Sequence, residues 1–226
     1  MSITPTTLTR AAAVALAIAG ALFIVIQPLH PHEDAASITT STWFIVHILS
    51  LTMAVFGLAG ITAVYLAQVA KSGILGLLGY LIFALFFITQ SAVNFTEAFI
   101  LPLTAAASPK LTEDVASLFV TGYVLQTDVG PLAIVGSIGA VLYLGGGVVF
   151  GAAVILGHLL PRWTGVLLIV AALASLSAAI LPHELARYAA LPMGIALIAL
   201  GLTLVARQRN ADTVSSESRR DAVASA

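Results

Sequence analysis

Histidines and carboxylates stand close together near the ends of long apolar segments, where they could bind a metal ion or a proton. The tripeptide Pro-His-Glu occurs twice, at residues 31–33 and 182–184, and each copy follows an apolar run. Because proline stops a helix, each His-Glu pair is expected at the end of a helix. The two copies are either similar ligand sets that face one site or polar helix ends without chemistry, and both interpretations stay open.

A histidine and a carboxylate also lie inside the apolar runs. His47 follows Trp43, an aromatic residue typical of a membrane interface, by four residues. Gln90, Asn94 and Glu97 share one face of a helix. A carboxylate that faces lipid is costly, so we expect Glu97 to face the bundle interior or a wet cavity. We expect Gln90 to join helices by hydrogen bonds, and the alternative for His47 is an interfacial histidine bonded to a backbone carbonyl.

Imidazole and carboxylate groups together suit a divalent transition metal such as Zn, Fe, Cu or Ni. Three protein ligands and a water would make a hydrolytic site, whereas four would make a structural one. The chain has no H-E-x-x-H motif, which excludes a zincin. The predicted set of metal ligands is His32, Glu33, His47, Glu97, His183 and Glu184.

Haem is an alternative cofactor for the same histidines. The axial pair would be His47 with His183 or His32, from different helices. Without a C-x-x-C-H motif the haem would be bound non-covalently. The chain has no cysteine at all, which excludes disulfides, thiolate metal sites, iron–sulfur clusters and thiol catalysis.

The composition places these residues in a membrane protein. Of the 226 residues, 60% are hydrophobic and 8% are charged, and the mean hydropathy is +1.08. Soluble domains are about 45–50% apolar and about 25% charged, so a soluble globular protein is excluded. The formal net charge of −1 gives no basic field to attract nucleic acid. The lipid bilayer is therefore the expected partner.

Six apolar runs are long enough to span a bilayer as helices. They are uniformly apolar rather than alternating, which argues against a β-barrel and predicts an all-α membrane bundle of about six helices. The first run is longer than a signal-peptide core and lacks a cleavage site, so we expect it to be retained. The bundle should cover residues 1–207 and a disordered cytoplasmic tail residues 208–226. The runs are 11–29, 43–70, 74–101, 132–157, 163–181 and 188–206.

The basic residues predict the orientation in the cell membrane, with both termini inside. Counting the connections alternately, the other side carries four histidines, seven acids and only two bases, Lys110 and Arg187. On that outer side, residues 108–127 should form a short amphipathic helix that lies on the surface or dips in as a lid. Its apolar face would hold Val115, Leu118, Phe119, Gly122 and Tyr123. The inner bases are Arg10, Lys71, Arg162, Arg207, Arg209, Arg219 and Arg220.

Two glycines one helical turn apart predict a packing face. Gly147 and Gly151 form a small-xxx-small face for close helix contact, inside the bundle or with another copy or a membrane partner.

One stretch of the chain resembles a known group of families. The stretch GHLLPRWTGVLL at residues 157–168 is similar to a cytoplasmic turn in families of uncharacterised bacterial six-helix multi-pass membrane proteins. The resemblance covers the fourth to fifth helices only, and it implies a bacterial membrane protein but no mechanism.

The function these features favour is binding or sensing, through an outward-facing His/carboxylate cluster that takes a metal ion or protons. A structural or accessory subunit without chemistry is one alternative, and a membrane metalloenzyme or haem protein is another. A transporter with Glu97 as its coupling residue would carry polar groups near the midplane and broken helices. Here the polar groups crowd the outer end, which counts against transport.

Overall fold

The computed structural model describes residues 3–120 and 122–224, with side chains described except at residues 183–184 and 212–224. Over these residues the chain is helical and contains no strand, so the predicted all-α class is confirmed. Within the described residues, five helical segments are long and apolar enough to cross a membrane. The elements in chain order are α1 (Pro5–Leu29), α2 (Ala35–Ile38), α3 (Ser41–Phe95), the π-helix η1 (Thr96–Ile100), α4 (Leu101–Thr104), α5 (Pro109–Ala116), the 3-10 helix η2 (Gly130–Ile134), α6 (Val135–Gly157), α7 (Arg162–Ala174), the 3-10 helix η3 (Ser175–Ala179), α8 (His183–Ala186), the 3-10 helix η4 (Arg187–Ala190) and α9 (Leu191–Ala224).

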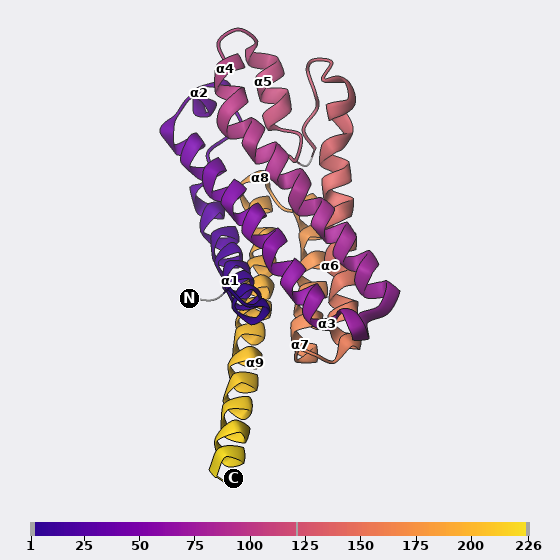
Figure 1. Ribbon diagram of the computed structural model, residues 1–226. Helices are drawn as coiled ribbons and strands as arrows, with labels where there is room; N and C mark the ends of the chain where they lie inside the picture. Colours follow the sequence, from indigo (N-terminus) through magenta and orange to yellow (C-terminus); the bar gives the residue numbers. More distant parts are fainter. Residues whose placement is uncertain (1–2, 121, 225–226) are drawn as a thin grey trace.

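The longest element, α3, consists of two arms that run in opposite directions from Gly73. Gly73 has φ 55° and ψ −151°, a positive-φ conformation that glycine adopts without a Cβ clash. Across this turn, the rings of Tyr65 and Tyr80 stack with centroids 4.7 Å apart, and Thr62 Oγ1 lies 3.2 Å from the Tyr80 hydroxyl. Figure 1 shows the two arms side by side, meeting at the lower right. The arms correspond to the second and third predicted runs.

The long helices close into a ring around a shared core. α3 packs on α1 and α6, α1 packs on α9, and α7 packs on both α6 and α9. Fully buried side chains from several helices fill the centre of this ring, where apolar burial and close packing hold the helices in register. They include Leu16, Phe83, Phe87, Phe150 and Leu197.

Glycines allow α6 and α7 to approach closely. A Cβ atom added to Gly151 would lie 2.8 Å from the carbonyl oxygen of Gly165, and one added to Gly147 would lie 2.6 Å from the Cβ of Ala172. The small-xxx-small face of α6 therefore packs against α7 of the same chain. Association with another copy or a membrane partner through these glycines stays a prediction.

The two ends of the bundle differ. The end that carries α2, α4, α5 and α8 is called the upper end here, and the turns at Gly73 and between α6 and α7 form the lower end (Figure 1). α1 begins at the lower end, and α9 extends below the bundle with a helical backbone to Ala224. The sequence instead predicts a disordered tail from residue 208. No glycine or proline follows Gly201, so nothing in the backbone chemistry stops the helix.

We expect Gly151→Ala to destabilise the protein by about 1–3 kcal/mol, because the added methyl group meets a backbone oxygen that cannot move away cheaply. Thermal unfolding in mild detergent measures the change. The matched control is Gly145→Ala on the same helix, whose added Cβ has its nearest neighbour, Ile82 Cγ2, at an ordinary 3.7 Å. Equal melting temperatures for the two variants would contradict the assigned α6–α7 contact.

Candidate functional site

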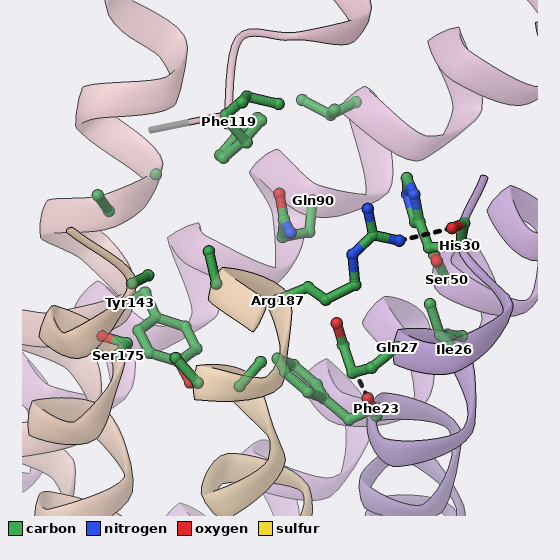
Figure 2. Close-up of a pocket in the computed structure, with 18 of the residues that line it drawn as sticks. Phe23, Ile26, Gln27, His30, Ser50, Gln90, Phe119, Tyr143, Ser175 and Arg187 are labelled. Carbon is green, nitrogen blue, oxygen red and sulfur yellow. Dashed lines mark hydrogen bonds between the residues drawn. The ribbon is translucent and has the colours of Figure 1, made fainter. Parts of the chain in front are cut away.

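A cavity of about 620 Å³ lies toward the upper end of the ring. This volume is within the range of sites that bind small molecules. Figure 2 shows 18 of the wall residues. The wall as a whole draws on α1, both arms of α3, η1, the segment after α5, α6, η3 and η4, among others. The wall is mostly apolar, with a few polar groups on it. The polar and charged groups include Gln27, His30, Glu33, Ser50, Gln90, Asn94, Glu97, Tyr143, Ser175 and Arg187.

The two arms of α3 bring His47 and Glu97 together. The Nε2 atom of His47 lies 3.3 Å from the Oε2 atom of Glu97, and the side chains are only 1% and 12% exposed. The Nδ1 atom of His47 lies 2.7 Å from the carbonyl oxygen of Trp43, one turn earlier on the same helix. Glu97 lines the cavity, as the sequence predicts. His47 thus contacts a backbone carbonyl on one side and a carboxylate on the other, and its role as a site residue stays a prediction.

This geometry requires one proton between His47 and Glu97. A carbonyl oxygen only accepts hydrogen bonds, so His47 Nδ1 must carry a hydrogen to donate to Trp43. Without a further proton, the lone pair of His47 Nε2 would face the Glu97 carboxylate and leave a buried negative charge. With one proton, the pair is either a neutral acid beside a neutral imidazole or an imidazolium beside a carboxylate, at a 3.3 Å separation that does not meet hydrogen-bond geometry. In both forms its net charge is zero.

A π-helical turn and Trp43 position the Glu97 backbone. In η1 the N–H of Leu101 donates to the carbonyl of Thr96, five residues earlier. The next donor in this pattern would be residue 102, which is a proline without an N–H, so the carbonyl of Glu97 lacks its helical partner. The indole Nε1–H of Trp43 donates to that carbonyl at 2.7 Å. Irregular turns of this kind occur often at functional sites.

A second cluster, His30, Glu33 and Arg187, adjoins this pair on the cavity wall. The ring centroid of His30 lies 5.1 Å from that of His47, and His30 Nδ1 lies 3.6 Å from Glu33 Oε1. Burial lowers the pKa of His30 below its usual value, against the raising effect of its bond to the Pro31 carbonyl. Arg187 Nη1 donates to the carbonyl of His30 at 2.5 Å, which ties η4 to the end of α1 (Figure 2).

The predicted metal-ligand set is only partly assembled. His47 and Glu97 meet, and Glu33 lines the same cavity but lies beside His30. His32 is exposed and is not among the residues that line the cavity. His183 and Glu184 begin α8, and their side chains lie outside the described residues. Among the described side chains, no group of three or more His, Asp or Glu residues is arranged to hold a metal ion.

Several cavity residues were not part of the predicted site. His30 lines the cavity where His32 was expected, although α1 ends at Leu29 as predicted. One sequence feature could have marked Arg187 as a site residue, since it is one of only two bases predicted on the acidic side. No feature of the sequence singles out Tyr143. Gln90 does not join helices through its side-chain oxygen, which is buried without a hydrogen-bond partner.

The segment after α5 folds back over the cavity, in contrast to the predicted amphipathic face. α5 ends at Ala116, so the expected stripe does not continue as a helix to Tyr123. The cause is Asp114, which is fully buried and accepts hydrogen bonds from the Tyr123 hydroxyl, the Gln126 N–H and both donors of Thr127, at 2.6–3.0 Å. Phe119 thereby reaches the cavity wall, near the top of Figure 2.

We expect the backbone N–H groups of Gln126 and Thr127 to lose protection from hydrogen exchange in Asp114→Asn. Burial raises the pKa of Asp114, but the hydrogen bonds from Thr127, Gln126 and Tyr123 together hold it below its usual value. Bonds to a charged acceptor are worth about 1.5–3 kcal/mol each, so loss of the charge opens the segment. The lowered pKa means that the stabilisation is present above about pH 4 and disappears as pH falls through the folded-state pKa.

Exchange rates measured at several pH values, corrected for intrinsic exchange, test this. The control is Asp128→Asn, since Asp128 is exposed and accepts only from the Gly130 N–H in the same turn. Unchanged protection of Gln126 and Thr127 in Asp114→Asn would show that the carboxylate does not hold the segment.

Comparisons with known proteins identify no relative. No protein-family model, curated protein or solved structure matches the chain. The similarity of residues 157–168 to uncharacterised bacterial membrane families therefore stays a prediction, and the function is argued from the site alone.

Proposed function

We propose that the chain is a six-helix protein of the cell membrane, with both termini inside, whose His47–Glu97 pair binds a proton from the outer side in a binding or sensing role. The observation that carries the proposal is the 3.3 Å approach of a buried imidazole nitrogen to a carboxylate oxygen on a cavity wall. The two arms of α3 supply two of the six crossings.

The distribution of charge supports this orientation. Arg10, Lys71, Arg162 and Arg207 belong to the lower end, with the termini. The excess of Lys and Arg on one side is the usual mark of the cytoplasmic face. The cavity and the His47–Glu97 pair then belong to the outer half of the bundle.

The extent of the cavity favours binding or sensing over transport. Its wall on α3 reaches no deeper than Met53 on the first arm and Phe86 on the second. A transport path would need polar groups that continue through the midplane to the opposite end. The pair is thus open to protons from one side. The groups that face it are His30 and Glu33 from the α1–α2 connection and Arg187 from η4.

Trp43 provides a direct optical test of proton binding. It is fully buried, and its ring centroid lies 4.1 Å from that of His47, so a change in the charge of His47 alters its fluorescence. We expect a single pH-dependent step in Trp163→Phe protein, which keeps Trp43 as its sole tryptophan. Both His47→Ala and Glu97→Gln should remove the step. Glu97→Gln should also keep the fold, since its amide places an N–H beside His47 Nε2 as the protonated acid places an O–H.

The matched control is His32→Ala, which removes an exposed histidine from the same side of the molecule. It should leave the step unchanged. A step that survives Glu97→Gln and His47→Ala, or that disappears in His32→Ala, would overturn the assignment of the proton to this pair.

A metal at the same place is the competing occupant. His47 and Glu97 supply two ligands, and a catalytic metal site needs at least three. We expect elemental analysis of detergent-purified protein to find no stoichiometric Zn, Fe, Cu, Ni or Mn. Near-stoichiometric metal that disappears in His47→Ala would replace the proton with a metal ion. If that metal were iron, the result would support the haem alternative.

A further inference from the structure

The cavity combines an apolar wall with one guanidinium group. Neither takes part in the proton binding proposed for His47 and Glu97. Phe23, Phe86 and the ring of Tyr143 provide much of the apolar wall. Arg187 extends across the middle of the residues drawn in Figure 2, toward His30. Cavities of this composition bind organic molecules, and their few polar groups fix the orientation of the ligand.

Arg187 has donors left over for a ligand. A guanidinium carries five N–H donors, and the structure uses one of them, on the carbonyl of His30. In the described part of the chain, Arg187 forms no ion pair. The two carboxylates on the wall, by contrast, each lie beside a histidine, Glu33 by His30 and Glu97 by His47. Arg187 is therefore the wall group that can offer several charge-assisted hydrogen bonds to a ligand, which favours an anionic head group.

The cavity is also open on its side toward α6 and η3. Val141 of α6 and Leu176 of η3 both belong to its wall, yet they are 69% and 57% exposed. α7 ends after 13 residues and continues only as the 3-10 helix η3, which shortens the wall there. In a bilayer, exposed apolar side chains at this level face acyl chains, so the opening admits molecules from the lipid phase.

We infer that the cavity binds a single-chain amphiphile with an anionic head group, a carboxylate or a phosphate. The head group lies on the free N–H donors of Arg187, and the apolar chain lies among Phe23, Phe86 and Tyr143. Its entry from the lipid phase rests on the membrane insertion proposed above. It does not rest on the proton shared by His47 and Glu97.

Four probes with the same tail test the head group: hexadecanoate, hexadecyl phosphate, hexadecanol and hexadecyltrimethylammonium. Native mass spectrometry of the full chain released from detergent micelles counts bound molecules per chain. We expect 1:1 complexes with the carboxylate, the phosphate or both, about tenfold or more tighter than with the alcohol or the ammonium. The anion retained identifies the head group.

Arg187→Gln should abolish the preference for the anion over the alcohol, which is a readout that a merely structural role would not move. Lys110→Gln is the matched control, since Lys110 is an exposed base on the same side of the molecule. Arg187→Lys keeps the charge without the guanidinium fork and should retain part of the preference. If Arg187→Gln does not fold, the four-probe comparison on the unaltered chain still shows whether the cavity prefers an anionic head group.

Three outcomes would overturn the inference. Tighter binding of the ammonium would show that Glu33 and Glu97 select cations, and no 1:1 complex with any probe would remove the cavity as an amphiphile site. An anion preference that persists in Arg187→Gln would place the head group elsewhere. In Glu97→Gln, which removes the proposed proton site, the anion preference should persist, so the two proposals fail independently.

Discussion

The contact between Trp43 and the backbone of Glu97 holds the upper end of the molecule together. In an apolar environment a backbone carbonyl without a hydrogen-bond partner costs several kcal/mol, and Pro102 has no N–H to serve as the helical donor to the Glu97 carbonyl. The indole N–H that replaces it comes from the opposite arm of α3. The Glu97 carbonyl thus receives its hydrogen bond only when the two arms of α3 fold against each other. The same contact brings Glu97 within 3.3 Å of His47.

The same constraint explains why two ionisable groups are tolerated where little water reaches. Trp43 makes two contacts, through its indole N–H and through its own carbonyl, and the second fixes which nitrogen of His47 faces Glu97. Once that nitrogen is fixed, one shared proton makes the pair neutral, and a neutral pair avoids the desolvation cost of a buried charge. Losing the proton restores that cost. Under the proposed function, the His47–Glu97 pair therefore has two states, one with the proton and one without it.

Much of the architecture follows from the sequence, and the site follows only in part. The apolar runs at residues 43–70 and 74–101 predict two helices, and the cost of a lipid-facing carboxylate predicts that Glu97 faces inward. The choice between His30 and His32 depends on how the chain turns just after α1 ends at Leu29, which the helix bounds and the composition do not determine. The cavity is less predictable still, because it is a gap left between segments far apart in the sequence, and its shape depends on where Asp114 folds the chain back.

His30 connects the two parts of the cavity wall. Its backbone carbonyl accepts from Arg187, and its ring lies 5.1 Å from the ring of His47. An anion that draws the guanidinium toward itself competes with that carbonyl for Arg187, and a shift of His30 changes the surroundings of the shared proton. By linkage, any effect of a bound anion on proton affinity equals the effect of the proton on anion affinity. The proposed sensing role rests on this connection through His30 between two groups on one cavity wall.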